Sequence, residues 1–423
     1  MTIQKLILHI AYKLKPILFH ILPVSYLRNI KKRMIYRNFK KLEQLQFVPY
    51  SAKLYPIGFN LIGSIRAETG LGQSCRLVAN ELKHSGYPML IYNYIQVGRI
   101  IQKDTSWDSY IEKECKYNIN IIHINPHELG MAYMQLDRKI WDGRYNIGFW
   151  LWELEEFPDE WLLCLRYMNE IWTPSEFISR GIRRKTSIPV YTIPYSIETE
   201  IEEGYTRKDF KLPEEKFLFL MMYDNNSVSE RKNPFGVIQA FKQAFSREET
   251  RVGLVIKINS PEKQELERLR KVLDGYENIY FITEVLEKKK VNSLIQCVDV
   301  VVSLHRAEGF GLVLAEAMQL GTPSIATNWS SNTEFMNENV AYMVKYKLVE
   351  LEKDYGPFKK GQHWAEADLE DAAAGMRKLY EDEKYYQDIS EKAKKYIEER
   401  LNIKHTTEFI QNRMNEIIEK NKG

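Results

Sequence analysis

Two glutamates, Glu308 and Glu316, stand eight residues apart with the triplet Gly309-Phe310-Gly311 between them. A short apolar run ends just before Glu308 and a helical pattern begins near Gly311, so Glu316 is expected about a turn and a half into a helix. Glycines at such a junction let backbone N–H groups approach an anion at the positive end of the helix. Because a carboxylate accepts hydrogen bonds from vicinal hydroxyls, the segment is suited to a long ligand with sugar hydroxyls and an anionic group. The alternative is a surface loop with two solvated glutamates.

Three cations are candidates for the anionic part of that ligand. Arg231 and Lys232 are adjacent in a loop between an expected strand, 217–222, and an expected helix, 234–245. Two cations at a strand-to-helix loop suit a diphosphate. Lys257 is unusual in an otherwise apolar strand, 252–258, and is expected to supply a further charge. The alternative for Arg231 is pairing with nearby acids.

A glycine-rich loop also follows the first expected strand of the chain. Gly70 and Gly72 lie where this loop opens a helix, and Arg76 follows one turn later. The loop either faces an anionic ligand or simply closes a turn. Arg76 is either a further anion contact or a surface residue.

These motifs together resemble the retaining glycosyltransferases of family 4, which have the two-domain GT-B architecture. The resemblance rests on E-x7-E enclosing GFG, on AEAM and Gly321-Thr322-Pro323 after it, and on the ERKNP segment ending at Pro234. It extends from about Leu54 to the C-terminal helices. The subgroup it points to contains bacterial O-antigen and capsule mannosyl- and rhamnosyltransferases.

The resemblance implies a role for most of these residues. Glu316 would bind the ribose hydroxyls of a nucleotide, and Glu308 the hydroxyls of the transferred sugar. The triplet between them would offer N–H groups to the sugar and diphosphate, and Gly70 and Gly72 would face the donor phosphates and the acceptor. In the family an Arg and a Lys several residues apart bind the diphosphate, whereas Arg231 and Lys232 are adjacent here.

The family keeps a histidine in the loop after the strand that corresponds to 119–124. Alignment puts Asn125 at that position, so His127 or His123 would have to substitute. The alternative is a loop histidine with its own local partners. Further along, Glu153 lies beside Trp150 and Trp152 and could line an acceptor site, although packing in the core is the simpler role for tryptophans.

The activity implied is transfer of a sugar from a nucleotide sugar to a glycan acceptor, with retention of configuration. No DxD motif follows a strand, so cations and helix N-termini would stabilise the leaving diphosphate, and we expect no metal and no cofactor beyond the donor. GDP-mannose is the donor suggested by the subgroup. Two alternatives stay open: a non-catalytic glycan- or nucleotide-binding protein of the same fold, and a nucleotide-sugar epimerase.

The order of elements predicts an α/β protein with two Rossmann-like domains whose parallel sheets face an interdomain cleft. We expect an acceptor domain at 42–200, a nucleotide-sugar domain at 201–385, and C-terminal helices at 386–423 that cross back to the first domain. The segment His363–Glu366 is expected to be structural, at the place where those helices cross.

Charge is unevenly distributed along the 423 residues. Residues 1–41 hold ten Lys and Arg and no acid, whereas residues 42–423 hold 50 basic and 57 acidic residues. This excludes a basic nucleic-acid-binding body. Residues 1–41 form a basic amphipathic leader that either lies on an anionic membrane or packs on the protein's own body. We therefore expect a cytoplasmic protein, peripheral on the inner face of the cell membrane, with a lipid-linked acceptor; four dispersed cysteines agree with a reducing compartment.

Overall fold

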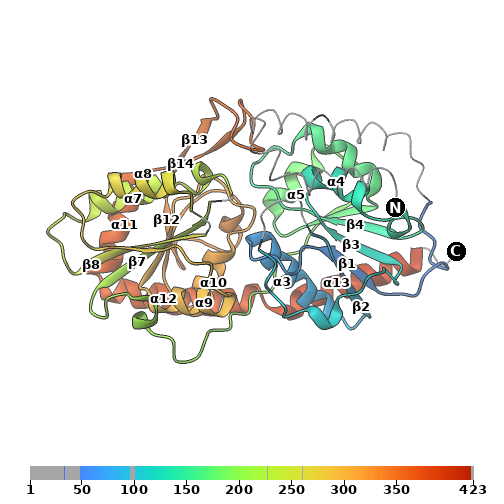
Figure 1. The fold of residues 1–423 in the computed structure, drawn as a ribbon, viewed down its shortest axis with the longest axis horizontal. Coiled ribbons are helices and arrows are strands. Elements are labelled where there is room, and N and C mark those ends of the chain that lie inside the picture. The colour runs from blue at the N-terminus through green and yellow to red at the C-terminus, as the bar shows by residue number, and fades with distance from the viewer. Residues whose placement is uncertain (1–32, 34–47, 96–100, 226, 260, 421–423) are drawn as a thin grey trace.

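The computed structural model describes Arg33 and residues 48–95, 101–225, 227–259 and 261–420, which form two lobes (Figure 1). Each lobe is built on one six-stranded sheet. The expected α/β class, with two Rossmann-like domains of the GT-B type, is confirmed. The basic leader, apart from Arg33, lies outside the described residues.

The first sheet has the strand order β2-β1-β3-β4-β5-β6, and all its pairings are parallel. Its strands are β1 (Phe59–Gly63), β2 (Met89–Asn93), β3 (Ile119–His123), β4 (Tyr145–Phe149), β5 (Glu170–Thr173) and β6 (Val190–Thr192). At its centre Leu61 pairs with Ile91 on one side and Ile121 on the other, and all three are fully buried. Burial on both faces explains why most residues of these strands are apolar.

The second sheet has the order β12-β11-β10-β7-β8-β9 and is also parallel. Its strands are β7 (Phe217–Asp224), β8 (Val252–Asn259), β9 (Ile279–Ile282), β10 (Val300–Ser303), β11 (Ser324–Thr327) and β12 (Tyr342–Val344). In both sheets the first strand of the lobe lies inside the sheet, with later strands on either side of it. This arrangement places the loops after the central strands at one edge of each sheet.

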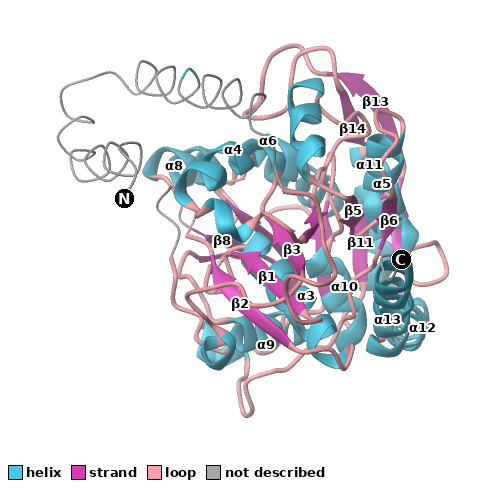
Figure 2. Cartoon of the chain, turned by 90° about the vertical axis from the view of Figure 1, so that its right-hand side faces the viewer, coloured by secondary structure: helices cyan, strands magenta, loops and turns pink. Residues whose placement is uncertain are grey.

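Helices cover both faces of each sheet (Figures 1 and 2). The α-helices are α3 (Gly70–His84), α4 (Pro126–Gln135), α5 (Glu176–Arg183), α6 (Ser229–Lys232), α7 (Pro234–Ala244), α8 (Lys263–Val272), α9 (Lys288–Cys297), α10 (Leu312–Leu320), α11 (Leu369–Glu381), α12 (Glu383–Arg400) and α13 (Ile403–Lys420). Short 3₁₀ helices are η1 (Asp108–Tyr110), η2 (Arg138–Ile140), η3 (Asp159–Tyr167), η4 (Arg207–Phe210) and η5 (Ser331–Glu334). None of the helices in the described ranges combines the length and apolar character needed to span a bilayer.

One element differs from the expectation. The segment His363–Ala367 is a strand, β14, paired antiparallel with β13 (Tyr346–Glu350), and does not lie at the helix crossing. The loop of this hairpin packs on the first domain, where Phe358 contacts Trp152 with ring centroids 5.3 Å apart. The hairpin therefore links the two domains at the top of the molecule in Figure 1.

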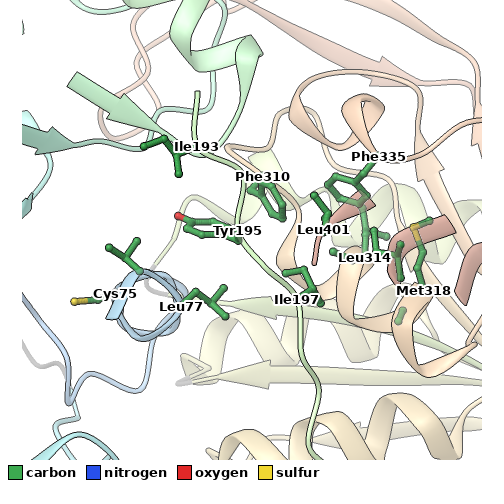
Figure 3. Close-up of a cluster of buried hydrophobic side chains, with 14 of the residues drawn as sticks. Cys75, Leu77, Ile193, Tyr195, Ile197, Phe310, Leu314, Met318, Phe335 and Leu401 are labelled. Atoms are coloured by element: carbon green, nitrogen blue, oxygen red, sulfur yellow. The ribbon is translucent and has the colours of Figure 1, made fainter. Parts of the chain in front are cut away.

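Two further segments connect the domains below the sheets. The linker that follows β6 carries Tyr195 and Ile197, which lie between Leu77 of α3 and Phe310 of the second domain (Figure 3). The ring of Tyr195 packs edge-on against Phe310 at 4.8 Å. Apolar contacts thus continue from one domain into the other, and α13 adds to them by packing on α3.

A buried ion pair attaches α13 to the first sheet. The Arg413 guanidinium contacts both carboxylate oxygens of Glu170, at 2.5 Å for the shortest contact, and Glu170 is fully buried. The Tyr145 hydroxyl donates to the same carboxylate at 2.9 Å. Because a buried charge without its partner is costly, this pair fixes the position of the last helix.

We expect Arg413→Met to lower the free energy of unfolding by about 3–5 kcal/mol, because it leaves the Glu170 carboxylate buried and unpaired. Urea unfolding followed by circular dichroism measures the change. Arg400→Met, at an exposed position of the preceding helix, is the matched control. The double variant Arg413→Met/Glu170→Gln should recover part of the loss, and no recovery would contradict the explanation.

Candidate active site

The structure brings the loops after β7 and β10 together around the Glu308 carboxylate. Lys232, the last residue of α6, contacts Glu308 through its ammonium group, and Arg231 Nη1 lies 3.4 Å from the same oxygen. Arg231 also donates to the Ala307 carbonyl at 2.7 Å. Both cations therefore hold the loop that carries Glu308.

Electrostatics keep this carboxylate ionised. Burial alone would raise its pKa, but Lys232 and Arg231 outweigh burial and lower the pKa of Glu308 to about 2. Burial in turn lowers the pKa of Lys232, and Glu308 opposes that shift. At neutral pH the site thus holds a carboxylate and two cations in close contact, which can accept bonds from hydroxyls and bind an anion.

The Gly309-Phe310-Gly311 triplet presents backbone toward the first domain and side chain toward the core. Phe310 is 5% exposed, and its ring packs against Tyr195 and Phe335. Gly311 has φ +97° at the N-terminus of α10, a conformation that favours glycine. A Cβ on Gly309 would lie 3.3 Å from the Trp152 carbonyl oxygen, so the first domain closes directly over this loop.

Glu316 is buried in α10 and forms an ion pair that the sequence patterns did not indicate. Lys288, the first residue of α9, places Nζ 2.6 Å from Glu316 Oε1. The only sequence signal was the run of three lysines at 288–290, which reads as an ordinary solvated face. Because this run follows β9, Lys288 lies beside Glu316, the carboxylate expected to bind the ribose.

Lys257 is not among the residues that contact Glu308, which are Arg231 and Lys232 in the ion pairs described above. It is 2% exposed on β8, its ammonium group contacts the Asn259 side chain, and Asp224 and Glu284 are the acids that influence it. Burial lowers the pKa of Lys257 to about 8 against the opposing effect of those acids. A buried lysine at the carboxyl end of a central strand stays a candidate anion contact.

This shift gives a prediction for stability. Since the folded pKa is below the unfolded one, the unfolded chain binds more protons between about pH 8 and 10.5, and the Lys257 contribution to stability rises with pH across that window. We expect this increment, about 3 kcal/mol at most, in the wild type and not in Lys257→Met. Urea unfolding at several pH values measures it. A pH dependence that is identical in the two proteins would contradict the assignment.

In the first domain, the glycine loop has clear packing roles. A Cβ on Gly72 would lie 2.0 Å from the Ala67 carbonyl oxygen, whereas one on Gly70 would meet nothing within 4 Å. Arg76 is buried, donates to the Ile65 and Ala67 carbonyls and pairs with Asp104 at 3.2 Å. Arg76 is therefore neither a surface residue nor a free anion contact. It holds the loop shape, while Gly70 remains exposed at the start of α3.

The three candidates for the family's histidine position lie in different surroundings. His123 is buried, with Nε2 2.6 Å from the Ser74 hydroxyl, and burial lowers its pKa to about 4. His127 is exposed on α4, with its ring 5.7 Å from that of Trp161. Asn125 accepts a hydrogen bond from the Leu151 amide at 2.9 Å, so it shapes the loop that follows β4.

The loop after β4 places Glu153 beside Arg231 of the second domain. Glu153 Oε1 lies 3.8 Å from Arg231 Nη2, and a Cβ on Gly309 would lie 3.8 Å from Glu153 Cγ. Trp150 and Trp152 are buried in the aromatic core, with Trp152 donating to the Glu156 carbonyl at 2.7 Å. The Glu153 side chain thus lies beside the charged residues of the second domain.

Other contacts hold the domains together near this site. The Glu334 carboxylate of the second domain accepts the Glu176 and Phe177 amides at the start of α5, at 2.9 and 2.7 Å. A pocket of ≈ 500 Å³ lies between the domains next to these contacts, and its walls include Pro174, Phe310, Glu334, Phe335, Tyr396 and Leu401. It borders Phe310, and its lining residues do not include Glu308 or Lys232.

Comparison with known families gives a match, which lies in the second domain. A family model described as "Glycosyl transferases group 1" matches residues 205–396, which contain Lys232, Glu308 and Glu316. Residues 205–396 are thus similar to glycosyl transferases group 1. Among the described residues, no group of three or more His, Cys, Asp or Glu is arranged to hold a metal ion.

Solved structures are similar to this chain over both domains. A glycosyltransferase from Rickettsia africae is similar with a TM-score of 0.63 and 12% identity over 86% of this chain and 99% of that one. Anabaena Alr3699/HepE in complex with UDP and glucose (TM-score 0.61, 12%, 85% and 100%) and sucrose-phosphate synthase from Thermosynechococcus elongatus (0.61, 12%, 86% and 100%) are similar as well. These likenesses establish the fold over both domains. No curated protein matches the sequence.

Proposed function

We propose that the chain is a retaining, metal-independent glycosyltransferase that transfers a sugar from a nucleotide sugar to a glycan acceptor. The observation that carries the proposal is the Glu308 carboxylate, held by Lys232 and Arg231 at the carboxyl ends of β7 and β10 within the residues similar to glycosyl transferases group 1. Glu316 lies on α10, eight residues farther along the chain, so the two carboxylates can contact different parts of a long ligand.

Each group has a task in the proposed reaction. Glu308 accepts hydrogen bonds from the sugar hydroxyls, and Glu316 accepts those from the ribose. Lys232 and Arg231, together with the N-terminus of α10, stabilise the negative charge that develops on the leaving diphosphate. Lys257 adds positive charge at the end of β8.

Two donors have support of different kinds. GDP-mannose follows from the resemblance to mannosyltransferases, and a UDP-sugar follows from the UDP in the structure of Anabaena Alr3699/HepE. A panel of GDP-, UDP- and dTDP-sugars, scored first by thermal shift and then by release of the nucleoside diphosphate, identifies the donor. We expect one base to shift the melting temperature clearly more than the others.

The same panel tests the proposal against its alternatives. A transferase releases nucleoside diphosphate, and in the presence of a glycan it forms a glycoside with the donor's anomeric configuration. An epimerase would return an isomeric donor without any acceptor. A binding protein would show the thermal shift with no turnover, and that result would refute the enzymatic proposal.

We further propose that the acceptor is lipid-linked and that the basic leader holds the catalytic body at an anionic membrane. The support is the distribution of charge, with ten cations and no acid in residues 1–41. Deletion of residues 1–41 should release the protein from anionic vesicles in a pelleting assay and preserve donor binding. Unchanged pelleting would mean that the leader does not anchor the protein.

A further inference from the structure

We propose that Glu153 is the general base that receives the proton of the acceptor hydroxyl. The proposal rests on the proposed glycosyltransferase function and assigns the acceptor side of the site, which the second domain does not contain. It concerns the loop after β4, residues 150–156, which we call the Glu153 loop.

The position of Glu153 is the first argument. Its carboxylate is 3.8 Å from Arg231 Nη2. Its Cγ would lie 3.8 Å from a Cβ placed on Gly309, which is van der Waals contact. The carboxylate therefore comes from the acceptor domain and borders both the diphosphate cations and the sugar-binding loop. An acceptor hydroxyl that approaches the sugar from the first domain has to pass beside it.

The second argument is that the two carboxylates, Glu308 and Glu153, differ in their contacts and in their exposure. Glu308 contacts Lys232 and Arg231, its backbone amide donates to the Ser330 hydroxyl at 2.9 Å, and its side chain is 11% exposed. Glu153 makes one long contact to Arg231, and its side chain is 28% exposed. Glu308 is thus fixed as a binding group, while Glu153 keeps carboxylate surface that a hydroxyl can reach.

The third argument is stereochemical. In a retaining transfer without a covalent intermediate, the acceptor oxygen attacks from the face that the diphosphate leaves. A base for that hydroxyl has to lie beside the cations that bind the diphosphate, which is where Glu153 lies relative to Arg231. A base on the opposite face would indicate inversion instead.

The bonding changes balance without any additional reactant. The acceptor oxygen forms a bond to the anomeric carbon of the donor as that carbon's bond to the diphosphate oxygen breaks. The electron pair of the broken bond stays on the diphosphate, whose charge Arg231 and Lys232 stabilise. The hydroxyl proton passes to the Glu153 carboxylate.

The Glu153 loop is rigid enough for this task. The Leu151 amide donates to the Asn125 side chain at 2.9 Å, and the Trp150 amide to the Trp172 carbonyl at 3.0 Å. Trp152 is anchored through its indole N–H and packs on Trp161 and Phe358. Asn125 is therefore a positioning residue for Glu153, and it acts through the backbone of the loop.

The test compares Glu153→Gln with the matched control Glu155→Gln, an exposed glutamate of the same loop that pairs with Arg184. The donor is the one identified in the panel, and the acceptors are water and a set of octyl α-glycosides. We expect Glu153→Gln to lower kcat about 10²–10⁴-fold for both kinds of acceptor, with the Kd of the nucleoside diphosphate within twofold of wild type. Glu155→Gln should retain wild-type kcat.

Chemical rescue separates a base from a structural role. Sodium formate should restore part of the turnover of Glu153→Ala, which it would not do if the side chain only supported the loop. Wild-type kcat in Glu153→Gln, or a change in nucleoside diphosphate Kd that accounts for the loss, would overturn the proposal. If the wild-type protein turned over no donor, the proposed glycosyltransferase function would be refuted. If wild type and Glu153→Gln were equally active, only the assignment of Glu153 as the base would be refuted.

Discussion

Lys232→Met is expected to lower kcat about 10²–10³-fold, equivalent to about 2.7–4 kcal/mol of transition-state stabilisation. Lys232 is partly buried at the end of α6, where its charge acts in a medium of lower dielectric than water. Negative charge grows on the diphosphate during bond cleavage, so the lysine contributes more in the transition state than in the bound donor. The effect should therefore fall on kcat more than on KM.

The control has to separate this effect from damage to Glu308. Lys232 is the strongest of the charges that lower the pKa of Glu308, so its removal lets that pKa rise from about 2. Any loss caused by protonation of Glu308 should shrink as the assay pH rises, whereas the loss caused by removal of the lysine charge should persist. Lys232→Arg should retain more activity than Lys232→Met. Lys242→Met, at a partly buried lysine that donates to the Val272 carbonyl, is the matched control and should leave kcat unchanged. Equal kcat values for Lys232→Met and wild type would contradict the role.

Most of the fold could be predicted because both sheets are parallel and buried. Runs such as Ile119–His123 and Val300–Ser303 are mostly apolar segments bounded by loops, and helical patterns alternate with them. The β13–β14 hairpin was missed because β13 has no buried residue and the hairpin depends on contacts with elements distant in the sequence. Arg306 shows this dependence: it forms a bidentate pair with Glu366, at 2.6 and 2.8 Å, that joins β14 to the loop before Glu308.

The site was only partly predictable, for a related reason. Motif spacing along one strand–loop–helix unit placed Glu308 and Glu316 correctly on loop and helix. Spacing carries no information about partners from distant elements, so the Lys288–Glu316 and Glu153–Arg231 contacts could not be inferred. Spacing also could not show that Gly72 and Arg76 serve the packing of their own loop. A glycine or an arginine in a sequence can belong to a turn as well as to a phosphate site, and residue type alone does not distinguish the two.

Glu316→Gln is expected to weaken binding of the nucleoside diphosphate about 10- to 100-fold, because hydrogen bonds to a charged acceptor are worth about 1.5–3 kcal/mol. The carboxylate is 3% exposed, so the ribose hydroxyls would exchange water for a preformed acceptor in a largely desolvated position. Isothermal titration calorimetry measures Kd directly. The same titration with the 2′-deoxy nucleotide is the sharper test: wild type should discriminate against it, and Glu316→Gln should not.

Lys288→Met distinguishes this role from a structural one. If Glu316 served only to pair with Lys288 and hold α9 against α10, removing the lysine would weaken nucleotide binding as much as Glu316→Gln does. If Glu316 binds the ribose, Lys288 competes with the hydroxyls for the same oxygen, which lies 2.6 Å from its Nζ. Lys288→Met should then keep the discrimination between ribose and deoxyribose and bind the nucleotide at least as tightly as wild type. A Lys288→Met protein that binds as weakly as Glu316→Gln and has lost that discrimination would assign the carboxylate to the helix pair instead.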